Sequence, residues 1–161
     1  MGDTYPTLRS DDWSVQSWDL RGHPTTVLQL EPFRLSWIAT RLVTFVHVIR
    51  RTPDDYQSVL DDYNALRKYA GKHKRSFLPF AFQCAYALLP IYVGRQFSES
   101  LIADIHNQYK KRWCILHVPS LFDTDTAELH TLKAKSYWGC IYRPFIDETI
   151  AEIAACPETA A

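Results

Sequence analysis

The sequence predicts a single three-layer α/β domain, with a mixed, mostly parallel sheet covered by helices on both faces. From residue 42 onward, short apolar runs rich in β-branched residues alternate with segments of helical hydrophobic spacing, in the order β-α-β-α-β-β-α. Each strand-helix-strand step forms a right-handed crossover onto a parallel sheet. The last two strands follow each other closely, so they add an antiparallel edge.

Length and composition agree with one domain that has its own core. The chain has 161 residues, of which 47% are hydrophobic and 22% are charged. A chain of this length buries about 70% of its extended surface, so it needs no metal or disulfide to fold. Residues 1–22 are expected to form an extended lead-in, residues 23–157 the domain, and residues 158–161 a frayed tail.

The charge balance narrows the classes of partner. Lys and Arg number 18, and Asp and Glu also number 18, so the formal net charge is zero. This balance argues against a protein that coats a polyanion. No apolar run approaches about 18 residues, and the first residues lack the pattern of a signal peptide. We therefore expect a cytoplasmic protein with reduced cysteines and no membrane partner.

Two strands are predicted in the first third of the chain. Residues 25–30 are short and β-branched, and Pro24 and Pro32 bound them. Residues 42–49 are apolar at nearly every position, as in a central strand that is covered on both faces.

The clearest helix is predicted over residues 53–70. Thr52 is the expected N-cap, and Pro53 occupies the first helical position, where it has no hydrogen bond to lose. Apolar side chains recur at helical spacing, and Gly71 follows as the expected C-terminal stop.

The middle of the chain continues the alternation. Residues 85–93 read as a strand that contains Pro90. Because proline cannot donate to a sheet ladder, this strand is expected at a sheet edge or with a bulge. Residues 98–112 then predict a helix capped by Ser98.

The last third predicts a hairpin and a helix. Residues 113–118 and residues 128–133 are expected to pair across an acidic turn. The final helix is expected to begin at Pro144, because proline suits a first helical turn.

This order of elements resembles that of the thioredoxin and glutaredoxin fold, in topology alone. The family places a C-x-x-C motif just after its first strand, where this chain has Arg50-Arg51-Thr52-Pro53. Its cis-proline precedes the third strand, whereas Pro119 lies toward the end of the corresponding strand here. Both departures argue against a redox function.

The same corner is a candidate anion site. Arg50, Arg51 and Thr52 lie beside the predicted start of a helix, whose exposed N–H groups bind anions, and Tyr137 or Arg143 could complete the site. The alternative is that the arginines end a strand and face water. No glycine-rich loop brings an anion close to the backbone.

A metal site is only weakly indicated. His117 and His130 lie on the two arms of the predicted hairpin and could meet across it. Cys114 is three positions before His117, which places it on the opposite face of an extended strand. No His/Cys motif completes a site, so no cofactor is expected.

Aromatic residues are abundant, with 5 Trp, 9 Tyr and 8 Phe. Aromatic side chains are enriched at protein interfaces. A bulky aromatic core explains the composition equally well. The candidates for an exposed interface patch are Trp37, Tyr92, Tyr137, Trp138 and Tyr142.

These observations favour a small protein-interaction or assembly module that binds another protein or itself. No catalytic set is evident. The alternative is an enzyme or a small-molecule or anion sensor with its site near Arg50, Arg51 and Thr52. A weaker alternative is nucleic-acid binding through the basic helix ends, at residues 67–75 and 110–112.

Overall fold

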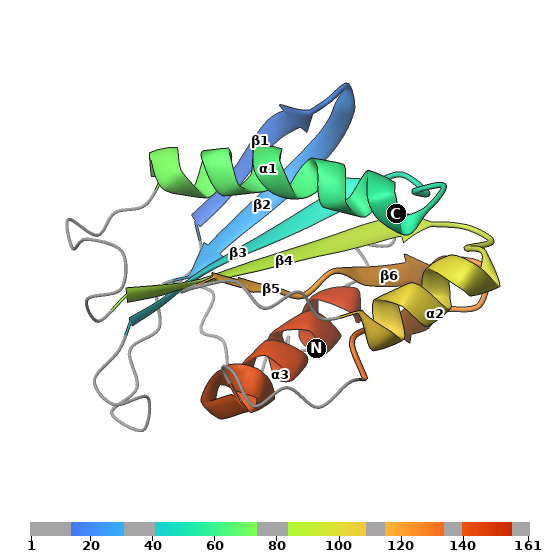
Figure 1. Cartoon of the computed structure of the whole chain (residues 1–161). Helices are drawn as coiled ribbons and strands as arrows, with labels where there is room; N and C mark the ends of the chain where they lie inside the picture. Colours follow the sequence, from blue (N-terminus) through green and yellow to red (C-terminus); the bar gives the residue numbers. More distant parts are fainter. Residues whose placement is uncertain (1–13, 31–40, 74–83, 109–114, 134–139, 156–161) are drawn as a thin grey trace, which may run out of the picture.

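The structure, a computed structural model, describes residues 14–30, 41–73, 84–108, 115–133 and 140–155. These form an α/β domain with a mixed seven-stranded sheet and three α-helices (Figure 1). The strands are β1 (Ser14–Leu20), β2 (His23–Leu30), β3 (Arg41–Arg50), β4 (Cys84–Gly94), β5 (Ile115–His117), β6 (Ser120–Asp123) and β7 (Glu128–His130). The helices are α1 (Tyr56–His73), α2 (Glu99–Asn107) and α3 (Arg143–Ala154).

The sheet has an antiparallel half and a parallel half. Its order is β1-β2-β3-β4-β6-β7, and β5 also pairs with β4. β2 is antiparallel to both of its neighbours, β1 and β3, whereas β3, β4 and β6 run parallel. β7 returns antiparallel to β6. The carboxyl ends of the three parallel strands therefore lie at one edge of the sheet, together with the β1–β2 turn.

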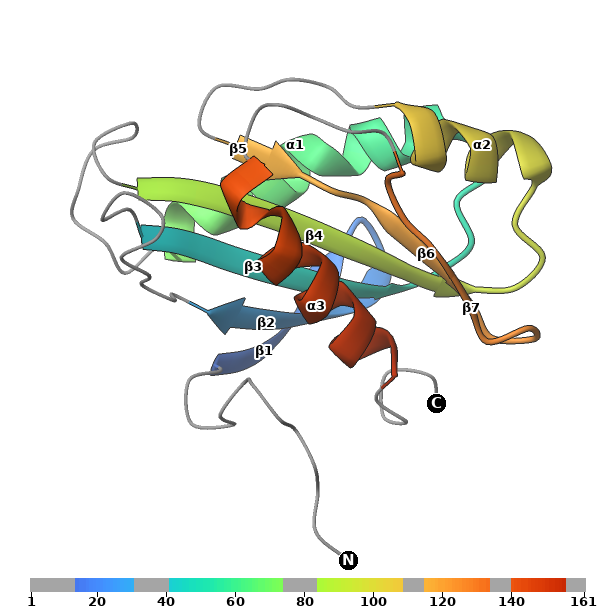
Figure 2. The same cartoon turned by 90° about the horizontal axis from the view of Figure 1, so that it is seen from below.

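Helices lie on both faces of the sheet. α1 and α2 share one face, because Leu66 and Leu101 belong to the same buried cluster. α3 lies on the other face, where Ile150 joins a cluster rich in aliphatic residues (Figures 1 and 2). The face beneath α1 is more aromatic, with five buried tyrosines: Tyr56, Tyr63, Tyr69, Tyr86 and Tyr92. No helix of the described part is both long and apolar enough to cross a membrane.

The antiparallel half includes chain that the sequence assigns to the lead-in. Residues 14–20 form β1, and Arg21 and Gly22 form a two-residue turn into β2. Both turn residues have positive φ, 54° and 89°, as in the type I′ turns whose twist matches that of the strands. Gly22 suits this backbone because it has no Cβ.

Helix α1 is present, but its predicted ends were wrong. It begins at Tyr56 because the Asp55 carboxylate accepts a hydrogen bond from Ser58 N at 2.8 Å, which caps the first turn. Thr52 is therefore not the N-cap. At the other end, Gly71 lies inside the helix, which continues to His73.

The predicted edge position of β4 was also wrong. β4 lies between β3 on one side and β5 and β6 on the other, so the sheet does not have the strand order that the thioredoxin resemblance implies. Val118 N donates to Leu88 O at 3.0 Å, so the backbone of Leu88 faces β5 and β6. Pro90, two residues further, faces the same side, level with the break between β5 and β6. A missing donor is tolerated at such a break.

The remaining elements agree in type with the predictions. Ser98 caps α2, because its hydroxyl accepts from Leu101 N at 3.3 Å. The predicted hairpin pairing was wrong, because β7 pairs with β6, a strand that was not predicted. The predicted first arm contributes β5, which pairs with β4 instead. α3 begins at Arg143, with Pro144 in its first turn. Residues 110–112 and 158–161 lie outside the described residues.

Candidate functional site

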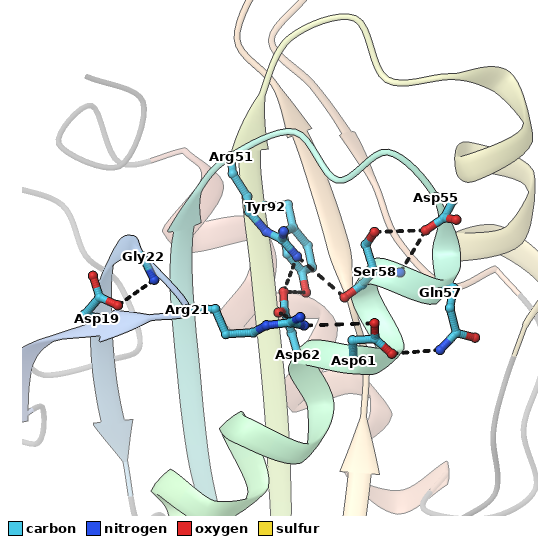
Figure 3. A network of polar contacts seen from close by, with 10 residues as sticks. All are labelled: Asp19, Arg21, Gly22, Arg51, Asp55, Gln57, Ser58, Asp61, Asp62 and Tyr92. Carbon is cyan, nitrogen blue, oxygen red and sulfur yellow. Dashed lines mark hydrogen bonds and ion pairs between the residues drawn. The ribbon is translucent and has the colours of Figure 1, made fainter.

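Arg51, at the carboxyl end of β3, makes a partly buried ion pair with Asp62 of α1 (Figure 3). Asp62 is 1% exposed, and Arg51 is 18% exposed. Arg51 Nη2 donates to Asp62 Oδ2 and to the carbonyl of Ser58 at 3.5 Å. Tyr92 on β4 donates its hydroxyl to the same Asp62 oxygen at 3.0 Å. These contacts tie β3, β4 and α1 together at the carboxyl edge of the sheet.

Arg21 brings a second positive charge to Asp62 from the β1–β2 turn. Its Nη1 lies 3.6 Å from Asp62 Oδ1 and 4.0 Å from Asp61 Oδ2 (Figure 3). Asp61 is about half exposed, so that contact contributes little to stability. The contact with the buried Asp62 carboxylate matters more, because it fastens the hairpin to α1.

Tyr92 takes part in this network as a neutral donor. Burial raises the pKa of its hydroxyl well above the ordinary value, and the negative charge of Asp62 raises it further. Arg51 acts in the opposite direction, but less strongly. The phenol therefore keeps its proton at physiological pH, and it stabilises the Asp62 carboxylate.

The structure does not assemble the predicted anion site. Thr52 is bonded to the next loop: its hydroxyl accepts from Arg95 N at 3.2 Å and donates to Arg95 O at 3.4 Å. Arg51 is bonded to Asp62, as described above. Arg50 is exposed. Arg143 lies on the other face of the sheet, where its Nε contacts Asp147 at 2.7 and 2.8 Å.

The two candidate metal-binding histidines have separate neighbours. The His117 ring lies edge-on to Tyr63, with 4.9 Å between centroids. His130 pairs with Leu121 across the hairpin, and its ring lies 5.8 Å from that of His106. Within the described ranges, no group of three or more His, Cys, Asp or Glu side chains could hold a metal ion.

The candidate aromatic patch does not include Tyr92 or Tyr142. Tyr92 is 0% exposed and Tyr142 is 9% exposed, so both are part of the core. Trp37, Tyr137 and Trp138 lie outside the described residues. Large hydrophobic side chains that are exposed in the described part are Val15, at 63%, and Ile141, at 43%.

The outer edge of β1 is a candidate site that the sequence reasoning missed. β1 is the outermost strand, and no described strand pairs with its far side (Figure 2). The two-residue turn makes Leu20 and His23 a hydrogen-bonded pair, so hydrogen-bonded and non-hydrogen-bonded pairs alternate from there along β1 and β2. Val15, Ser17 and Asp19 belong to the non-hydrogen-bonded pairs. Their backbone N–H and C=O groups therefore point outward, away from β2.

Three contacts hold β1 firmly against α1. The Tyr69 hydroxyl donates to Gln16 Oε1 at 2.7 Å. The rings of Trp18 and Tyr69 lie 4.6 Å apart, and Arg21 contacts Asp62 just beyond the strand. β1 thus presents its outer edge as a fixed, extended strand.

A sequence signal for this hairpin was present. The pair Arg21-Gly22 stands between two stretches with strand-like residues, as in a short hairpin.

No family model, no curated protein and no solved structure matches this chain.

Proposed function

We propose that this protein is an assembly module that pairs β1 with β1 of a second copy, so that two sheets join into one. The observation that carries this proposal is the outer edge of β1, a regular seven-residue strand without a described neighbour. Exposed strand edges offer unpaired N–H and C=O groups that bind another strand.

An antiparallel pair of β1 strands from two copies is compatible with two-fold symmetry. With Ser17 opposite Ser17 of the second copy, Val15 faces Asp19 of that copy across the two-fold axis. Every outward N–H then meets a carbonyl, as in an isologous dimer. The two Asp19 carboxylates lie at opposite ends of the paired strands, where they do not repel each other.

The composition of β1 also supports pairing. Natural edge strands usually avoid association through charged side chains, especially lysine, or through proline or a bulge. The sequence of β1, SVQSWDL, has one charged residue, Asp19, and neither lysine nor proline, and its pairing with β2 is continuous. The formal net charge of zero adds no general repulsion between copies.

The other functions have less support. An anion sensor at the Arg51 corner would have to displace Asp62 from Arg51 and Arg95 from Thr52. Nucleic-acid binding rests on basic residues, and those at 110–112 lie outside the described part. The cytoplasmic location remains a prediction from the sequence.

Replacing Ser17 with proline tests the proposal. The Ser17 N–H points outward, so Ser17→Pro removes a donor from the interface and leaves the ladder with β2 intact. We expect wild-type mass to rise toward that of a dimer over a concentration series in light scattering. Strand pairing alone buries little surface, so the dissociation constant is expected to be about micromolar to millimolar. The Ser17→Pro variant is expected to stay monomeric.

Ser17→Thr is the matched control, because it keeps the N–H and a strand-favouring side chain. It is expected to associate like the wild type. Circular dichroism checks that all three proteins keep the fold. A wild-type protein that is monomeric throughout the series, or a folded Ser17→Pro variant that still dimerises, would contradict self-association through β1.

A further inference from the structure

A hollow of about 460 Å³ lies against the outward side of α1, away from the sheet. Asn64, Arg67 and Lys68 line it. Their spacing, i, i+3 and i+4, places these side chains on one side of the helix. All three are exposed, whereas Leu66 and Tyr69 between and beside them face the core.

Arg67 differs from the other described arginines in having no partner among the residues that the structure describes. Among the arginines whose side chains the structure describes, Arg67 alone has neither a hydrogen bond nor an ion pair. The partnered ones are Arg21, Arg50, Arg51, Arg95 and Arg143. Lys68, the next residue, likewise has no partner within the described part. Two adjacent positive charges at one hollow therefore lack a counter-charge within the part of the chain that the structure describes.

We propose that this hollow, lined by Asn64, Arg67 and Lys68, binds the phosphate group of a small organic molecule. The guanidinium of Arg67 can donate two parallel hydrogen bonds to a phosphate, and Lys68 adds a compact positive charge. The Asn64 amide supplies a neutral donor. The residues lie more than one turn before the end of α1 at His73, beyond the range over which the helix dipole opposes an anion.

The volume favours a small molecule over a nucleic acid. Pockets of about 300–1,000 Å³ hold small organic ligands, and a phosphate alone fills only part of such a space. A nucleic-acid backbone requires a row of cations along several phosphates. Among the described residues that line the hollow, two cations lie beside each other, and they match one phosphate group.

Phenyl phosphate is a suitable probe, with phenol as its neutral counterpart. We expect phenyl phosphate to shift the NMR signals of Asn64, Arg67 and Lys68 in the full chain, and to saturate, at constant ionic strength. Phenol at the same concentrations is expected to leave them unchanged. The Arg67→Gln variant is expected to lose at least tenfold in affinity, and Lys68→Gln several-fold.

Arg95→Gln is the matched control, because Arg95 is exposed but already pairs with Asp125 at 3.4 Å. Its affinity for phenyl phosphate should equal that of the wild type. Shifts that do not saturate, equal shifts with phenol, or unchanged affinity in both Arg67→Gln and Lys68→Gln would overturn the proposal. Tighter binding of a single-stranded oligonucleotide that depends on the same residues would also overturn it.

Discussion

His47 on β3 is fully buried beneath α1, and neither ring nitrogen has a hydrogen-bond partner among the described residues. Its ring lies 5.5 Å from that of Tyr69 and 6.0 Å from that of Trp18. Burial, followed by the nearby His117, lowers the pKa of His47 from 6.5 to about 3. The imidazole is therefore neutral in the folded protein.

This histidine makes the folded state sensitive to acid. Between pH 6.5 and about 3, the unfolded chain binds a proton at His47 that the folded chain does not bind. The free energy of unfolding is therefore not reduced by His47 above pH 6.5. Below that pH it falls as the pH falls, by about 1.4 kcal/mol per pH unit. In His47→Leu, urea unfolding at pH 7, 6 and 5 should show a shallower loss of stability. Parallel losses in wild type and variant would contradict this account of His47.

At the residue scale, the sequence drew attention to Arg51 but not to its partner. Charge alone marks an arginine at a strand end. Asp62, however, lies on the same helix face as the buried Val59 and Leu66, and this spacing was not used to predict a buried carboxylate. A buried carboxylate requires a cation, and Arg51 lies just before the helix. Helix periodicity could therefore have identified the pair.

At the scale of elements, Asp62 is the point where α1, β3, β4 and the β1–β2 turn are joined. Replacing it with asparagine leaves Arg51 without its counter-charge in a mostly buried position. We expect Asp62→Asn to lower the free energy of unfolding by about 3 kcal/mol, at the low end for a broken buried pair because Arg51 keeps some exposure. Urea denaturation measures this loss.

Asp61→Asn is the matched control for that experiment. Asp61 contacts the same Arg21, but its side chain is 49% exposed, so the change should cost less than about 1 kcal/mol. Equal losses in the two variants would show that Asp62 does not hold these elements together.

The predicted elements show which signals are local and which are not. β3, α1 and α2 were predicted because apolar spacing and capping are properties of short segments. The position of β4 in the sheet was not predicted, because Pro90 shows only that one backbone N–H donor is missing from the strand. Whether that gap lies at a sheet edge or beside a break in the neighbouring strand depends on β5 and β6, about 30 residues further on.

At the scale of the whole molecule, the α/β class and the mixed sheet follow from the pattern of the chain, but the strand order and the candidate interface do not. The sequence favoured an aromatic surface, and two of those residues, Tyr92 and Tyr142, are buried in the core. The open edge belongs to a strand that was assigned to the lead-in. Which strand is outermost depends on the order of the whole sheet, so no single segment encodes it.

Hydrogen exchange along β1 tests the central claim, that copies of the chain pair through this strand. In a monomer, the amides of Val15, Ser17 and Asp19 point outward and exchange quickly, whereas those of Gln16 and Trp18 are protected by β2. We expect concentrated protein to protect the three outward amides and to leave the inward ones unchanged. Outward amides that exchange equally fast in dilute and concentrated protein would contradict pairing through β1.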